Sequence, residues 1–316
     1  MSKFKIHHLT KYLYEVPVRD SANQFMLYPL KDDYQEVLQQ SIKITGDPQV
    51  SVHQDYFGNE VGTFTHSKPH QELLIDSRLV VVTKSRALPT DQEPVEEQWK
   101  ALEKLTGHPS YIDFLKQEYF VALPELSAVA ASERCKNCSP LVVAKEFCAY
   151  VFENFKYRKG ITTIESTLDD IWSIKSGVCQ DFAQILLVML RLVHIPARYV
   201  SGYICPNTTG MRGEGATHAW VEAFLPGYGW LGLDPTNNCV VNETHVRLAV
   251  GKNFTDCSPV KGTYRGTSEH TLEVEVSVSY ENGRRSDGTN EVVRPGPIES
   301  FSKNSYRRHQ EMQQQQ

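Results

Sequence analysis

A strongly apolar segment occupies residues 179–193. Its apolar side chains recur at helical spacing and cover nearly the whole circumference of a helix; they are Phe182, Ile185, Leu186, Leu187, Val188, Met189, Leu190, Leu192 and Val193. A helix that is apolar on all sides is typically buried. Gln184 and Arg191 interrupt the run, which is also too short to span a bilayer. The pattern therefore predicts a central buried helix that begins at Cys179.

Cys179 stands at the start of this helix, where unpaired N–H groups and the positive end of the helix dipole meet. Both features stabilise a thiolate, the nucleophilic form of cysteine. A cysteine is more commonly a small buried hydrophobe, so its position alone decides nothing. Two residues downstream favour a chemical role: His218 and Asp234 fall on successive predicted strands, at 217–225 and 230–234. A Cys-His-Asp relay requires these residue types.

The two strands predict how the histidine and the aspartate meet. Alternate positions of the first strand share one face; they are His218, Trp220, Glu222 and Phe224. If the hairpin turns tightly through residues 225–227, His218 lies directly opposite Asp234, with Cβ atoms about 4.5–5.5 Å apart. A register shifted by one residue would turn Asp234 to the other face. We therefore predict antiparallel pairing of 218–224 with 228–234.

The first 84 residues read as short β-strands separated by turn signals. The predicted strands are 3–16, 37–45, 49–53, 60–65 and 72–83. Many short strands at this spacing predict a sandwich-like β domain, and no candidate chemistry concentrates there. Residues 85–92 have the composition of a linker, and the pattern turns helical over 93–157.

The helical part contains a Cys-x-x-Cys motif at Cys135 and Cys138. A single such pair supplies at most two of the four ligands of a structural zinc site, and no second pair follows at a suitable spacing. We interpret the motif as part of a loop between helices. Farther along the chain, 195–203 and 272–278 read as strands and 237–271 as loop-rich.

Composition narrows the class of protein. The chain has 316 residues, of which 40% are hydrophobic, so it holds enough apolar material for a sizeable core. The formal charge of −5 argues against a nucleic-acid surface, and no segment predicts a membrane span. The chain start lacks the apolar stretch of a signal peptide. Seven scattered cysteines indicate free thiols in a reducing compartment, so we expect a cytoplasmic location.

Four motifs, in this order, resemble the bacterial transglutaminase-like family of candidate cysteine proteases. They are Gly-Val-Cys-Gln-Asp-Phe-Ala at 177–183, Ile-Pro-Ala-Arg-Tyr-Val-Ser-Gly-Tyr at 195–203, Thr-His-Ala-Trp at 217–220 and Leu-Asp-Pro-Thr at 233–236. The segments Tyr-Leu-Tyr-Glu at 12–15 and Asp-Tyr-Phe-Gly-Asn at 55–59 resemble the β domain that precedes the core in that family. The resemblance covers residues 1–280 and is least specific around 93–150.

The resemblance implies an α+β protein. An N-terminal β-sandwich-like domain (1–84) precedes a helical part (93–157) and a papain-like, transglutaminase-like core (158–280) with a central helix packed on an antiparallel sheet. The tail, 281–316, has the composition of a disordered segment. The resemblance also assigns Cys179 as the nucleophile, His218 as the general base and acid, and Asp234 as the residue that orients the histidine.

These roles predict an enzyme that acts on amide bonds of a peptide or protein through a thioester on Cys179. The N–H of Cys179 is the natural first oxyanion donor, and Gln180 and Trp172 are candidates for the second. Water as acyl acceptor gives a peptidase or deamidase, which we favour because water needs no second substrate site. An amine gives a transglutaminase. A non-catalytic binding module on the same scaffold is the alternative outside enzymology. We expect no metal and no cofactor, and the sequence leaves the oligomeric state open.

Overall fold

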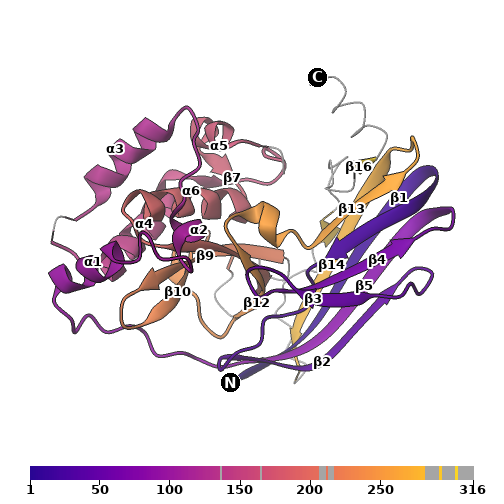
Figure 1. The fold of residues 1–316 in the computed structure, drawn as a ribbon, viewed down its shortest axis with the longest axis horizontal. Helices are drawn as coiled ribbons and strands as arrows, with labels where there is room; N and C mark the ends of the chain where they lie inside the picture. Colours follow the sequence, from indigo (N-terminus) through magenta and orange to yellow (C-terminus); the bar gives the residue numbers. More distant parts are fainter. Residues whose placement is uncertain are drawn as a thin grey trace.

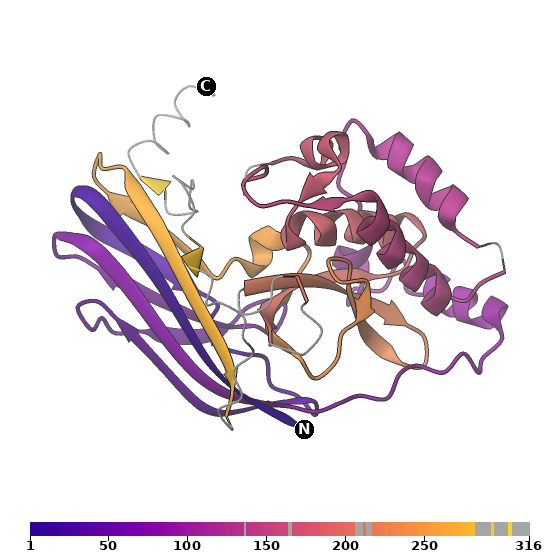
Figure 2. The same ribbon diagram turned by 180° about the vertical axis from the view of Figure 1, so that it is seen from behind.

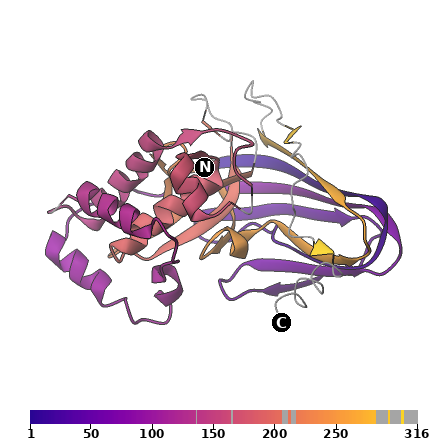
Figure 3. The same ribbon diagram turned by 90° about the horizontal axis from the view of Figure 1, so that it is seen from above.

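The computed structural model describes residues 1–135, 137–163, 166–205, 211–212 and 217–281, together with the short strands β15 (Val292–Val293) and β16 (Lys303–Asn304). A β-rich lobe and a mixed α/β lobe lie side by side, as Figures 1 and 3 both show. The predicted tail falls largely outside the described residues. None of the helices in the described part is long and apolar enough to cross a membrane.

The β-rich lobe is built around β1 (Ser2–Phe25), a strand of 24 residues. Its first half pairs with β5 (His70–Thr83) and β14 (His270–Tyr280), and its second half pairs with β4 (Glu60–His66) and β13 (Val260–Arg265). Further strands extend the sheet: β2 (Gln35–Ile44) pairs with β5, β3 (Ser51–Gln54) with β4, β15 with β14 and β16 with β13. Both halves of β1 bury alternate side chains in one shared apolar core, which includes Phe4, Ile6, Val18 and Phe25. The predicted β-rich N-terminal region is confirmed.

The C-terminal part of the predicted core belongs instead to this β-rich lobe. β13 and β14 both pair with β1, although we assigned residues up to 280 to the catalytic part. The strand pattern at 272–278 was recognised, but its partner lies more than 250 residues away, and periodicity cannot identify so distant a partner. The structure also places a strand, β12 (His245–Gly251), and a short 3-10 helix, η1 (Phe254–Cys257), in the segment read as loop-rich.

The α/β lobe packs helices on a five-stranded sheet (Figure 2). The strand order is β11 (Cys239–Val240), β10 (Gly229–Asp234), β9 (Thr217–Leu225), β8 (Ala197–Ile204) and β12. The helices are α1 (Val95–Glu103), α2 (Ile112–Leu115), α3 (Leu123–Glu133), α4 (Pro140–Asn154), α5 (Leu168–Ile174) and α6 (Cys179–Leu192). A small ladder pairs β6 (Lys156–Tyr157) with β7 (Ser176–Gly177). This arrangement confirms the predicted α+β core with its central helix.

Different parts of the protein pack on the two faces of this sheet. Buried apolar residues of α6 and the alternating positions Ala219, Val221 and Ala223 of β9 belong to one core cluster. On the opposite face, Trp220 packs with Val200 and Val250 and with Leu30 and Phe57 of the β-rich lobe. The β-rich lobe therefore covers the face of the sheet that carries His218.

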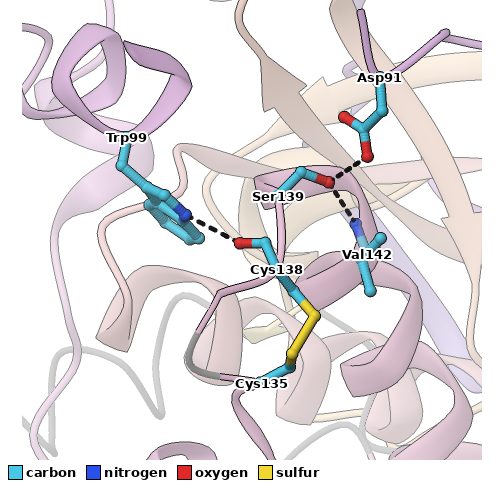
Figure 4. The surroundings of a disulfide bond; sticks show 6 residues. All are labelled: Asp91, Trp99, Cys135, Cys138, Ser139 and Val142. Carbon is cyan, nitrogen blue, oxygen red and sulfur yellow. Dashed lines mark hydrogen bonds between the residues drawn. A yellow bond between two sulfur atoms is a disulfide. The ribbon is translucent and has the colours of Figure 1, made fainter. Parts of the chain in front are cut away.

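Cys135 and Cys138 form a disulfide at the loop between α3 and α4 (Figure 4). Trp99 Nε1 donates to the Cys138 carbonyl (3.0 Å), and Ser139 caps α4 by accepting from the Val142 N–H. The location of the motif in a loop between helices agrees with the prediction. The prediction that all cysteines are free is wrong, because three-residue spacing in this loop lets the two thiols meet.

Candidate active site

Cys179 is the first residue of α6 and is half-buried. The turn before it is fixed by Asp181, whose Oδ2 accepts from the Val178 N–H (2.7 Å) and from the Thr162 hydroxyl (2.7 Å). Gly177 is required here, because a Cβ at this position would lie 2.2 Å from Asp181 Oδ2. The Gly-Val-Cys-Gln-Asp sequence thus holds the sulfur at a defined helix start, where the first backbone N–H groups of a helix have no acceptor within the helix.

His218, the second residue of β9, meets Asp234 at the end of β10 with an Nε2–Oδ2 distance of 2.9 Å. Both side chains are fully buried. Because a carboxylate only accepts hydrogen bonds, Nε2 of His218 carries a proton, which leaves Nδ1 for the cysteine. Among the described residues Nδ1 has no hydrogen-bond partner, but the Cys179 side chain is close enough to act on the histidine's pKa.

The strand register differs from the predicted one by two residues. The structure pairs Trp230 with Phe224 and Gly232 with Glu222, so Asp234 lies diagonally from His218 instead of directly opposite. The cause is a turn of the same length that lies one residue further along the chain: Leu225 pairs with Gly229, Pro226 and Gly227 form the centre of the turn, with φ of 71° at Gly227, and the Tyr228 N–H donates to the Leu225 carbonyl at 3.2 Å. A shift of two residues keeps both side chains on one face, and the imidazole spans the diagonal.

Asp234 is held by four donors. Besides His218, its oxygens accept from the Thr236 N–H (2.9 Å), Asn237 Nδ2 (2.7 Å) and, at 3.4 Å, Nε2 of His245. Burial alone raises the pKa of a carboxyl, but the two histidines hold the pKa of Asp234 well below its usual range. The carboxylate is therefore charged and fixed in orientation.

The pKa of His218 is shifted in the opposite direction, upward. Burial lowers the pKa of His218, but the charge and hydrogen bond of Asp234, with the Cys179 side chain, outweigh burial and raise it to about 10. An imidazolium between a carboxylate and a sulfur is the form that pairs with a thiolate and later protonates a leaving group. The geometry thus brings together the three residues that the sequence singled out.

The candidates for the second oxyanion donor fare differently. Trp172 is buried in the core, and its Nε1 donates to Glu125 Oε2 (3.0 Å), so this N–H is occupied. The candidacy of Trp172 is wrong for that reason. Gln180 is the half-buried second residue of α6, directly after Cys179, and remains a prediction, as does the N–H of Cys179 itself.

Sequence reasoning missed His245, at the start of β12, whose Nε2 lies 3.4 Å from Asp234 Oδ2. A lone histidine in a segment read as loop carries no local signal. His218, Asp234 and His245 also place their ligand atoms within 4.8 Å of one another, and within the described residues they are the group that could hold a metal ion. The Asp234 oxygens already accept N–H donors, which is the chemistry of a hydrogen-bonded relay.

The sequence comparisons agree with this fold. Residues 130–235 match the model of the transglutaminase-like superfamily, and residues 4–82 match that of the bacterial transglutaminase-like N-terminal region. An uncharacterized protein of Mycobacterium leprae is 30% identical over 284 residues, which cover 88% of this chain and 99% of the relative. The chain belongs to the bacterial transglutaminase-like family.

Two further comparisons concern the core and the overall structure. A protein-glutamine gamma-glutamyltransferase of Pseudomonas aeruginosa is 32% identical over 121 residues, covering 36% of this chain and 18% of that protein. A solved structure from Cytophaga hutchinsonii, named as a candidate cysteine protease, has a TM-score of 0.71 at 20% identity, covering 95% of this chain and 96% of that one. At that identity the likeness shows that the two proteins share a fold, and the match extends over both lobes of this chain.

The prediction of a cytoplasmic location is wrong. It depended on cysteines that stay free, whereas Cys135 and Cys138 are paired. We therefore withdraw the cytoplasmic prediction.

Proposed function

We propose that the protein is a cysteine-dependent enzyme that acts on amide bonds of peptides or proteins. The observation that carries the proposal is the buried His218–Asp234 pair at 2.9 Å, with Cys179 at the start of α6 acting on the same histidine. A structural cysteine would need neither a charged imidazole nor a carboxylate fixed behind it. These intact partners favour catalysis over a non-catalytic binding module on the same scaffold.

The proposed reaction begins with attack of the Cys179 thiolate on the amide carbonyl. The N–H of Cys179 at the helix start stabilises the tetrahedral oxyanion. His218 then donates a proton to the leaving amine, which breaks the C–N bond and leaves a thioester on Cys179. Asp234 keeps the imidazole in the tautomer that presents Nδ1 to the sulfur. The reaction proposed here needs no cofactor.

Two candidate activities differ in the molecule that accepts the acyl group from Cys179. Water releases a carboxylic acid and makes the protein a peptidase or a deamidase; this is the activity we favour, because water needs no second substrate site. An amine releases a new amide and makes it a transglutaminase. The similarity of the core to a protein named as a protein-glutamine gamma-glutamyltransferase gives the second activity its support.

Mass spectrometry of the intact protein tests the covalent step and the acceptor together. After brief incubation with a library of glutamine-containing peptides and rapid acid quench, we expect an acyl adduct that maps to Cys179. The Cys179→Ala variant, whose fold should be intact because a small residue replaces a small one, should carry none. Chasing the adduct with buffer or with a primary amine distinguishes hydrolysis from transfer. Equal turnover by Cys179→Ala and the parent protein would exclude the covalent mechanism.

A further inference from the structure

His245 contacts the same oxygen of Asp234, Oδ2, that accepts the hydrogen bond from His218. Its side chain is fully buried, with Nε2 at 3.4 Å from Asp234 Oδ2 and Nδ1 at 3.2 Å from the Thr244 hydroxyl oxygen. Burial lowers the pKa of His245 although Asp234 opposes that effect, so the ring is neutral. A carboxylate accepts only, which puts the single ring proton on Nε2, directed at Asp234.

Aromatic packing fixes the His245 ring in this orientation. Trp220 meets it edge-on, with ring centroids 5.2 Å apart, and Trp220 also lies 6.2 Å from the His218 ring. The charged or titratable groups that act on His245 are Asp234 from β10 and His218 from β9. On its Nε2 side the ring therefore makes one hydrogen bond, in which Nε2 donates to the Asp234 carboxylate.

His245 begins β12, an edge strand of the sheet that pairs with β8 on one side. On its other side, two side-chain amides of the β-rich lobe replace a neighbouring strand. Gln35 donates to the Arg247 carbonyl and accepts from the Arg247 N–H, both at 2.8 Å. Asn59 makes the same two bonds with Val250, again at 2.8 Å each.

A third contact lies just before His245. The Thr83 hydroxyl at the end of β5 donates to the Glu243 carbonyl at 2.6 Å. The β-rich lobe thus holds β12 at its start, middle and end. Asn59 belongs to the Asp-Tyr-Phe-Gly-Asn segment, and its paired bonds give that motif a physical reason: a shorter or apolar side chain would leave the Val250 N–H and carbonyl buried without partners.

We infer that His245 is a positioning residue for Asp234, and that the β-rich lobe fixes it by clamping β12. The inference rests on the proposed function. A series of contacts leads from the lobe to the reacting sulfur. Hydrogen bonds of Gln35 and Asn59 hold the backbone of β12, which carries His245. His245 and His218 both donate to Asp234, and the other side of the His218 ring faces Cys179. The β-rich lobe is then a required part of the catalytic unit.

Two matched amide variants test the donor role of His245. In His245→Gln the amide nitrogen reaches the position of Nε2, whereas in His245→Asn it is too short. The readout is the rate at which iodoacetamide alkylates Cys179 as a function of pH, measured by peptide mapping, which needs no substrate. We expect His245→Asn to slow alkylation near neutral pH by on the order of tenfold and to move the profile to higher pH, since a hydrogen bond to a charged group is lost. His245→Gln should keep the parent profile.

His245→Leu removes the donor while it fills the space, and provides a second variant if His245→Asn does not fold. An unchanged pH profile in His245→Asn or His245→Leu, with the protein folded by thermal unfolding, overturns the inference. Equal effects of Gln and Asn at this position also overturn it, because packing alone would then explain the loss.

The clamp is tested by Asn59→Ala and Gln35→Leu, which lie outside the catalytic machinery. Each should move the Cys179 profile in the same direction as His245→Asn by a smaller, few-fold amount. Thr45→Val, which removes one hydrogen bond to the Leu74 N–H inside the β-rich lobe, serves as the matched control and should leave the profile unchanged. Parent-like profiles in both clamp variants would refute the role of the lobe.

The failure of this inference is distinguishable from the failure of the proposed function. If Cys179 of the parent protein is alkylated no faster than the buried thiols, the activated-cysteine proposal itself fails. If the parent profile depends on His218, as shown by His218→Ala, but not on His245, only the present inference fails.

Discussion

Replacing Asp234 by Asn is the perturbation for which the structure makes the most detailed prediction. The carboxylate accepts from four donors, at 2.7 Å (Asn237), 2.9 Å (His218 and Thr236) and 3.4 Å (His245). An Asn side chain keeps one oxygen, which can stay with the Thr236 N–H, and presents an NH₂ group to the remaining donors. To bond that group, His218 must expose a lone pair on Nε2 and carry its proton on Nδ1.

That tautomer points a proton at Cys179 and removes the base that the sulfur needs. The same substitution in the Ser-His-Asp triad of a serine protease lowers kcat by about 10⁴ through the wrong tautomer, which sets the order of magnitude expected here. Alkylation of Cys179 near neutral pH should fall with it. Breaking a buried ion pair on one side also costs about 3–5 kcal/mol of folding free energy.

The stability loss should depend on pH with a definite sign. The pKa of His218 is raised above 6.5 to about 10, so its contribution is complete below pH 6.5 and is lost as the pH rises toward 10. The pKa of Asp234 is held below 3.8, so its contribution is present above that pH and is lost as the pH falls. Urea unfolding of Asp234→Asn and the parent protein should therefore differ more at about pH 5.5 than at about pH 9. An equal difference at both values, or undiminished alkylation of Cys179, would refute the reasoning.

Two further predictions concern the turn before Cys179. Asp181→Ala removes the acceptor of the Val178 N–H and should cost about 1–2 kcal/mol by chemical unfolding and slow Cys179 alkylation, whereas Asp181→Asn, which keeps an acceptor, should do less. Gly177→Ala places a Cβ 2.2 Å from Asp181 Oδ2 and should lower the free energy of unfolding by about 1–3 kcal/mol. The control Gly107→Ala, with nothing within 4 Å of the added Cβ, should unfold at the same temperature as the parent protein. Equal unfolding temperatures of the two variants would show that the turn adapts to the added Cβ without loss of stability.

The central helix and the triad residues were accessible to sequence reasoning because their signals are local. The apolar periodicity of 179–193 predicts α6 to within a residue, since a buried helix must be apolar on all sides. The alternation along 217–225 gives the correct face for His218. The predicted hairpin register differs from the observed one by two residues. Because side chains alternate between the faces of a strand, a shift of two residues leaves Asp234 on the predicted face.

The rest depends on contacts that join distant parts of the chain. β13 and β14 are ordinary short strands in sequence, and their assignment to the β-rich lobe depends on pairing with β1 at the other end of the chain. His245 becomes meaningful only when β12 takes its place in the sheet, and β12 is held there by Gln35 and Asn59. The disulfide likewise depends on how the loop after α3 folds.

The central claim, that Cys179 is an activated nucleophile, is tested most directly by competitive alkylation of the free cysteines. Burial raises the pKa of the Cys148, Cys205 and Cys257 thiols well above the usual value, and burial together with Asp234 raises the pKa of Cys239 to about 12. Cys179 is half-buried and faces His218. After brief treatment with iodoacetamide near neutral pH, peptide mapping should find Cys179 labelled well ahead of these four thiols, and the advantage should vanish in His218→Ala. Labelling of Cys179 no faster than that of Cys148 or Cys239 in the folded parent protein would contradict the account.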